Sequence, residues 1–243
     1  MAISIRLRDV LPLLAALVLV VLCFALPPIY ADEAEPATAE AETTRVLIID
    51  AGHGGEDGGA TTAEGVPESG INLAIAQKLE ALAGLCGVES VMTRESQDIY
   101  YPESASTTAQ RKQADQKARI ELINAQSDAV LISIHQNFFP TAQPSGCQVL
   151  YGKPEGSREL GELTHRNLTE ALCPTSRRVA APISEDIYLM RSAKCTSILV
   201  ECGFLSNPSE AALLQTEDYQ LKISALLLAS YLQYEAGSDG MVL

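Results

Sequence analysis

The sequence is short of basic residues, and this limits the kinds of partner that it can have. Its 243 residues include 17 lysines and arginines but 31 aspartates and glutamates, so the net charge is −14 at pH 7. A chain with this balance gains nothing from counterion release on nucleic acid, and it has no polybasic patch for anionic lipid. We therefore exclude nucleic acid as a partner. A sugar polymer or a peptide would have to bind through local contacts.

The sequence also lacks the paired cysteines that are typical of structural zinc sites. None of its six cysteines shows CxxC spacing, so zinc ligation by cysteine is not expected. Several lie in apolar stretches, and we interpret the set as buried free thiols. The six are Cys23, Cys86, Cys147, Cys173, Cys195 and Cys202.

Residues 1–31 have the pattern of an export segment. Arg6 and Arg8 precede an apolar run from Val10 to Leu26, and a cleavage site follows Ala31. The run is at the short limit for crossing a bilayer, so a cleaved signal peptide and a retained anchor that contacts the membrane both remain open. Either interpretation places the folded domain outside the cytoplasm, secreted or held at the outer face of the membrane. Export would permit disulfides.

The rest of the chain divides into three parts. Residues 32–44 are acidic, rich in alanine and free of large apolar side chains, which is typical of a disordered linker. Residues 45–235 are long enough for one sizeable α/β core. Residues 236–243 are expected to form a loose tail. We find no internal repeat, second domain or wall-binding module in the sequence.

Strand-like and helix-like segments alternate along residues 45–235. Continuous apolar runs predict strands covered on both faces, and apolar residues at helical spacing predict helices. This alternation predicts a single α/β domain with a mostly parallel twisted sheet of about six strands and helices on both faces. The predicted strands are 45–50, 88–93, 129–134, 146–151, 187–190 and 197–200, and the predicted helices are 69–85, 109–126, 157–172 and 209–234, the last with a break near Thr216.

The glycine-dense segment GHGGEDGG follows the first predicted strand and at first sight suggests a phosphate loop. The dinucleotide pattern needs glycine where the chain has Asp57, and the Gly-Lys-Ser/Thr ending of a nucleotide loop is absent. We instead infer that the glycines let the backbone turn sharply, so that His53 can face a cleft.

Three potential metal ligands follow or flank predicted strands. His53 and His135 come after strands one and three, and Glu68 opens the helix between them. Two imidazoles and one carboxylate would leave an open position on zinc, as catalytic sites require. Spacing alone leaves a second interpretation open, in which the histidines are hydrogen-bonded loop residues.

Glu201 directly follows the apolar strand SILV. A carboxylate in this position is costly to bury unless it has a partner or a task. Beside zinc, it could take a proton from water and pass it to a leaving amine. The alternative is that the carboxylate caps the following loop.

Several blocks of the sequence, taken in order, resemble one enzyme family. They are IDAGHGGEDGGA, ESGINLAIAQKL, VMTRESQD, ARIELINAQSDAVLISIHQN and ILVECGFLSNPSE, and the match runs from Arg45 to about Tyr234. These blocks are similar to those of the zinc-dependent N-acetylmuramoyl-L-alanine amidases with a His-Glu-His metal site. The short N-terminal segment and the lack of targeting modules are similar to the small amidases of spore-cortex maturation.

The resemblance implies a role for each candidate residue. One zinc ion would be held by His53, Glu68 and His135, Glu201 would be the catalytic general base, and Asn137 would lie near the substrate. The reaction would be hydrolysis of the amide between N-acetylmuramic acid and the L-alanine of the peptidoglycan stem peptide, so residues 45–235 would be a zinc amidase catalytic domain. An activator protein is a possible partner.

Two rival hypotheses remain. The same ligands could serve a zinc exopeptidase or deacylase that acts on a different amide. The chain could also be a wall-binding protein with a vestigial site, although the intact set of three ligands and Glu201 argues against this.

Overall fold

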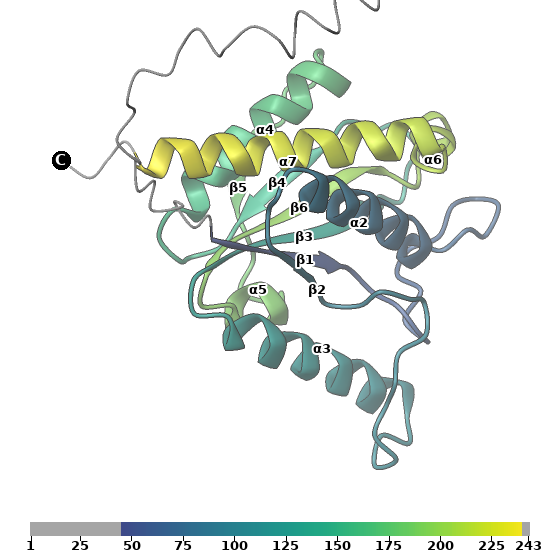
Figure 1. Cartoon of the computed structure of the whole chain (residues 1–243). Helices are drawn as coiled ribbons and strands as arrows, with labels where there is room; N and C mark the ends of the chain where they lie inside the picture. The colour runs from purple at the N-terminus through teal and green to yellow at the C-terminus, as the bar shows by residue number, and fades with distance from the viewer. Residues whose placement is uncertain (1–44, 240–243) are drawn as a thin grey trace, which may run out of the picture. The chain divides into compact units, whose positions relative to one another are not determined.

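A six-stranded sheet runs through the part of the chain that the structure describes, residues 45–239 of this computed structural model (Figure 1). Its order is β2-β1-β3-β6-β4-β5, and the predicted α/β class is confirmed. The predicted export segment and acidic linker lie outside the described residues. Within residues 45–239, no helix is both long and apolar enough to cross a bilayer.

The sheet is mostly parallel, as predicted. The strands β2, β1, β3 and β6 are parallel and have their carboxyl ends at one edge. β4 runs antiparallel to β6, and β5 pairs with β4. The strands are β1 (Val46–Ala51), β2 (Ser90–Met92), β3 (Ala129–Asn137), β4 (Gln148–Tyr151), β5 (Ala181–Pro182) and β6 (Thr196–Phe204).

Helices cover both faces of the sheet (Figure 1). One face packs a large apolar core against α2 (Glu68–Leu85), α4 (Ser157–Leu172) and α7 (Glu217–Asp239). The other face packs a smaller core against α3 (Thr108–Ala125) and α5 (Tyr188–Ser192). Strand residues on both faces are buried, which explains the continuous apolar runs in the sequence.

One predicted strand is wrong. Residues 187–190 were expected to be extended, but residues Tyr188–Ser192 form the short helix α5. A four-residue apolar run fits a buried strand and a buried helical turn equally well, so periodicity cannot separate them. The sixth strand is instead β5, a two-residue edge strand that contains Pro182, and edge positions are where a sheet tolerates proline.

The two strands that carry His135 and Glu201 are longer than predicted. β3 continues to Asn137 and β6 to Phe204, so His135 and Glu201 lie within strands rather than directly after them. The two residues are partners in the parallel register of β3 and β6. The three additional residues at the end of β3 and the four at the end of β6 therefore bring the predicted site residues side by side.

The predicted break near Thr216 is confirmed. The helical segment divides into α6 (Pro208–Leu214) and α7, and Asn207 caps α6 by accepting hydrogen bonds from the Ser209 and Glu210 amides. α7 then runs to Asp239, past the predicted helix end at residue 234. The last four residues of the predicted tail lie outside the described residues.

A buried ion pair fixes the end of β1 against α3. Arg119 Nη1 lies 2.9 Å from Asp50 Oδ1, and both side chains are almost fully buried. Burial by itself would raise the pKa of Asp50, but Arg119 and the hydroxyls of Ser133 and Thr93 outweigh it and lower that pKa to about 2. The same guanidinium donates to the carbonyls of Ala51 and His53. This pair therefore sets where the chain leaves β1.

We expect Arg119→Met to lower the free energy of unfolding by about 3–5 kcal/mol, because it leaves Asp50 as an unpaired buried charge. Denaturant unfolding followed by circular dichroism measures the change. Arg158→Met is the matched control: Arg158 pairs with Glu162 at the same helical spacing as Arg119 with Asp115, but on the exposed surface. Equal stabilities of the two variants would contradict the role given to the buried pair.

Candidate functional site

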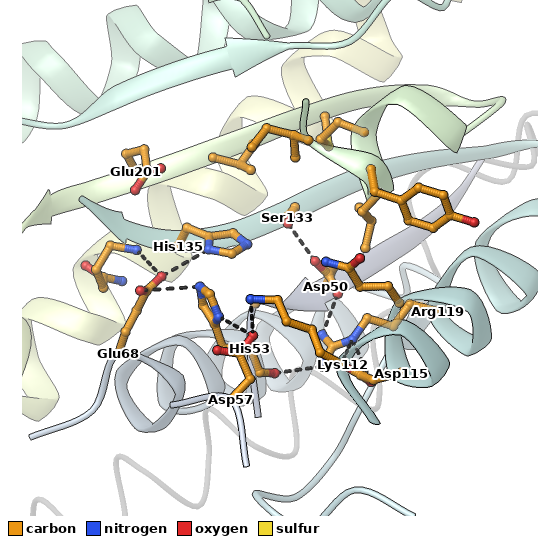
Figure 2. Close-up of a pocket in the computed structure, with 18 of the residues that line it drawn as sticks. Asp50, His53, Asp57, Glu68, Lys112, Asp115, Arg119, Ser133, His135 and Glu201 are labelled. Carbon is orange, nitrogen blue, oxygen red and sulfur yellow. Dashed lines mark hydrogen bonds and ion pairs between the residues drawn. The ribbon is translucent and has the colours of Figure 1, made fainter. Parts of the chain in front are cut away.

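The candidate residues meet at the carboxyl edge of the parallel strands, in a cavity of about 460 Å³ (Figure 2). His53 follows β1, His135 lies in β3 and Glu201 lies in β6, while Glu68 is the first residue of α2. Neighbouring parallel strands place their carboxyl ends together, and this is the usual position of chemistry in such sheets. The structure thus brings together four side chains that are far apart in the sequence.

Glu68 stands between the two histidines. Its Oε1 lies 3.0 Å from His135 Nδ1, and its Oε2 lies 3.4 Å from His53 Nε2. One ligand atom from each of the three residues lies within 4.8 Å of the others. This cluster could hold a metal ion, and it matches the predicted ligand set.

The surroundings of Glu68 keep it ionised. Burial by itself would raise its pKa, but hydrogen bonds and charge from His135 and His53 outweigh the burial and hold the pKa well below its usual range. The backbone amides of Ala60 and Gln136 also donate to its two oxygens, at 2.9 and 3.0 Å. Glu68 is therefore a fixed anion at the N-terminus of α2, where the helix dipole favours negative charge.

Arg94 ties the end of β1 to the start of α2. Its guanidinium donates to the carbonyls of Ala51, Gly52 and Ser69 at 2.8–3.1 Å. These bonds connect the two segments that carry His53 and Glu68. The contacts of this arginine are therefore structural, because all three are with backbone carbonyls.

The glycines after β1 allow the close approach that the cluster needs. A Cβ at Gly52 would overlap the His135 ring at Cε1 and Nε2. His53 itself has φ 59°, which is uncommon for a residue with a side chain, and Gly54 follows with φ 132°. The inference that glycines turn His53 toward a cleft agrees with this geometry.

Asp57 and Lys112 extend the cluster, and the sequence analysis did not find them. Asp57 Oδ2 lies 3.0 Å from His53 Nδ1 and 2.7 Å from Lys112 Nζ (Figure 2). An aspartate that accepts the Nδ1 proton leaves Nε2 of His53 free to bind a metal. In the sequence, Asp57 drew notice only because a dinucleotide loop would need glycine at its position. Its place four residues after the candidate ligand His53 was the pattern that could have identified it as a neighbour of the site.

Glu201 is in a different environment from Glu68. It lies beside His135 on the neighbouring strand, and its Oε2 is shielded from solvent without a hydrogen-bond partner among the described residues. Burial raises the pKa of Glu201 to about 6. His135 lowers this pKa in part, and the negative charge of Glu68 adds to the rise. An orphaned carboxylate oxygen beside a metal-type cluster makes Glu201 a candidate for proton transfer.

The alternative role for Glu201, as a cap of the following loop, belongs to another residue. Glu210 accepts hydrogen bonds from the backbone amides of Phe204 and Gly146, at 2.8 and 2.7 Å. The loop after β6 is therefore closed without Glu201.

Asn137 ends β3, two residues beyond His135. Its carbonyl accepts a hydrogen bond from the Leu205 amide at 2.8 Å, and a register irregularity between β3 and β6 lies just before it. Its side chain is half-buried, and within the described residues it has no recorded hydrogen bond. Asn137 does not line the cavity that holds His53, Glu68, His135 and Glu201, so its contact with a substrate stays a prediction.

Comparison with known proteins decides the family. The family model of the N-acetylmuramoyl-L-alanine amidases matches residues 47–230, nearly the whole described domain. The chain belongs to this family. This confirms the predicted enzyme class.

Individual relatives of this amidase agree with the family match. The germination-specific N-acetylmuramoyl-L-alanine amidase of Bacillus subtilis is 35% identical over 191 residues, which cover 78% of this chain and 79% of the relative. The CwlD amidase of Clostridioides difficile, solved in complex with the GerS lipoprotein, is 36% identical with a TM-score of 0.75, and the match covers 79% of this chain and 98% of that one.

A more distant structure shares the same fold. The catalytic domain of CwlV, an N-acetylmuramoyl-L-alanine amidase from Bacillus (Paenibacillus) polymyxa, is 25% identical with a TM-score of 0.64. The match covers 78% of this chain and 97% of that domain.

We expect Gly52→Ala in this amidase to weaken zinc binding roughly 10- to 100-fold, the range typical of lost support around a metal ligand. The added methyl would displace the His135 ring. Competition with a fluorescent zinc chelator measures the affinity. Gly84→Ala is the control, because a Cβ there meets nothing within 4 Å and an alanine inside a helix is favourable. Unchanged zinc affinity in the Gly52 variant would contradict the proposed position of His135.

Proposed function

We propose that this amidase hydrolyses the bond between N-acetylmuramic acid and the L-alanine of peptidoglycan stem peptides, with one zinc ion and with Glu201 as the general base. The observation that carries the proposal is the register of β3 and β6. It sets an unpaired carboxylate of raised pKa beside a His-Glu-His cluster. Membership of the N-acetylmuramoyl-L-alanine amidase family supports the same reaction.

The three side chains of the cluster fit zinc. Two imidazole nitrogens and one carboxylate are a donor set that leaves a position for water or substrate. Asp57 orients His53, and backbone amides orient Glu68, so the ligands are held before a metal arrives. When bound, zinc would supply Lewis-acid polarisation of the scissile carbonyl and make water a stronger acid.

Glu201 supplies the proton transfers. As a carboxylate it accepts a proton from the attacking water, and as the acid it then donates that proton to the departing amine of alanine. A pKa of about 6 suits both steps, because the group can hold and release a proton near neutral pH. Asn137 would orient the substrate through its free side-chain amide.

The place of action also belongs to the proposal. Relatives of this chain are N-acetylmuramoyl-L-alanine amidases, whose substrate is peptidoglycan, and residues 1–31 have the pattern of an export segment. We place the domain outside the cytoplasm, secreted or anchored at the outer face of the membrane, with its substrate in the cell wall. The germination-specific relative supports a role in spore-cortex maturation.

An activator protein is the partner that we propose besides peptidoglycan. The related CwlD amidase was solved in complex with a lipoprotein, GerS, and a partner of that kind fits an exported domain. The described domain carries no wall-binding module of its own, so a partner could supply localisation.

We expect Glu201→Gln to lower kcat for peptidoglycan by at least roughly 100-fold while zinc content stays unchanged, because a carboxamide cannot accept the proton. Mass spectrometry of the products from purified sacculi measures the activity and identifies the bond cleaved. The parent protein should release stem peptides with a free N-terminal L-alanine.

Two controls sharpen this experiment. Glu64→Gln changes an exposed carboxylate that does not line the cavity and should retain activity, and a chelator should abolish the activity of the parent protein. Release of free D-alanine would identify a carboxypeptidase instead. Full activity of the Glu201 variant would contradict the role assigned to that residue.

The activity should also depend on pH in a defined direction. Glu201 has to be ionised to accept a proton, and its pKa is raised to about 6, so kcat/KM should fall as the pH drops through about 6. Kinetics on soluble muropeptides between pH 4.5 and 8, roughly, with zinc content checked at each pH, measure this dependence. A flat profile with zinc fully bound would argue against Glu201 as the base.

A further inference from the structure

Two cysteines that are distant in the sequence touch in the structure. Cys147 Sγ lies 3.2 Å from Cys173 Sγ, although 26 positions separate the residues. Cys147 precedes β4 and is buried, whereas Cys173 is the C-terminal cap of α4 and is partly exposed. No other pair of sulfur atoms in residues 45–239 has a recorded contact.

The surrounding backbone already holds the two segments together. A Cβ at Gly146 would come within 3.1 Å of Ser176 Oγ and 3.6 Å of Cys173 Sγ, so the chain after α4 packs directly on the chain before β4. Gly146 is also held from the other side, because its amide donates to Glu210. A bond between the sulfurs needs an approach of only about 1 Å from this contact.

From this contact we propose that the exported protein carries a disulfide between Cys147 and Cys173. The proposal rests on the proposed location outside the cytoplasm, where an oxidant is available. The oxidant is a disulfide-bearing molecule, either a thiol–disulfide oxidoreductase or a small-molecule disulfide.

The chemistry follows the exposure of the two thiols. The Cys173 thiolate attacks one sulfur of the oxidant, which breaks the oxidant's S–S bond and forms a mixed disulfide. Cys147 then loses its proton and attacks Cys173 Sγ, so the protein disulfide forms, the mixed disulfide breaks, and the two sulfurs of the oxidant end as two thiols. The hydrogen bond with Cys147 lowers the pKa of the Cys173 thiol and outweighs the opposite effect of its partial burial. Cys173 is therefore favoured as the first nucleophile.

The bond would stabilise the strand next to the site. Gln148 directly follows Cys147 and is the register partner of Glu201 in the antiparallel pairing of β4 and β6. A cross-link from this point to the end of α4 would close a loop that contains all of β4 and α4. Closing it should raise the unfolding temperature by roughly 5–10 °C relative to the reduced protein.

Mass spectrometry of the protein isolated from its own cells, with thiols blocked at lysis, tests the proposal. We expect one disulfide-linked peptide pair that contains Cys147 and Cys173, and blocked thiols at Cys86, Cys195 and Cys202. Blocked thiols at both Cys147 and Cys173 would overturn the proposal.

A second arm uses the purified, reduced protein with oxidised glutathione. It should form the same link and gain the thermal shift, and Cys173→Ser should lose both, whereas Cys195→Ser should keep both. Absence of pairing in vitro would overturn the geometric basis. Pairing in vitro but free thiols in cells would overturn the disulfide in the native protein and count against the proposed location, while the amidase assay tests the catalytic proposal separately.

Discussion

The rest of the site depends on the contacts that the carboxylate of Glu68 makes with two histidines. It lies between His53, which follows β1, and His135, which lies in the adjacent strand β3, and it starts the helix α2 that packs on those strands. Because Arg94 and Arg119 hold the backbone at the end of β1, the two histidines meet this carboxylate in one fixed arrangement. The fold thus places at the edge of its sheet a group of side chains that could hold a metal ion.

Two glutamates in one cavity have opposite environments, and this difference supports the separate roles that we propose for them. Amides and imidazoles surround Glu68, so its pKa is held low and it stays a carboxylate that can bind a cation. Glu201 has a shielded, unpaired oxygen, and burial raises its pKa to about 6. A pair of carboxylates whose pKa values are pushed apart is the pattern that assigns one to binding and the other to proton transfer.

The sequence predicted the parts of this arrangement that depend on periodicity and on residue type. Continuous apolar runs identified β1, β3 and β6, and scarce histidines at strand ends identified the cluster, because both signals are local. The apolar run at 187–190 gave a wrong strand, because so short a run has no periodicity that separates a strand from a helical turn, and α5 buries only Leu189 and Met190 of it. The contacts of Asp57 with Lys112, and of Cys147 with Cys173, are made only by tertiary packing, so no local pattern could reveal them.

Zinc X-ray absorption on the purified protein, loaded with a single equivalent of zinc, tests the central claim most directly. Ligation by His53, Glu68 and His135 predicts only nitrogen and oxygen neighbours, with the scattering signature of two imidazoles. Sulfur neighbours, or no binding at one equivalent, would contradict the account, because the cluster around Glu68 would then not be the metal site.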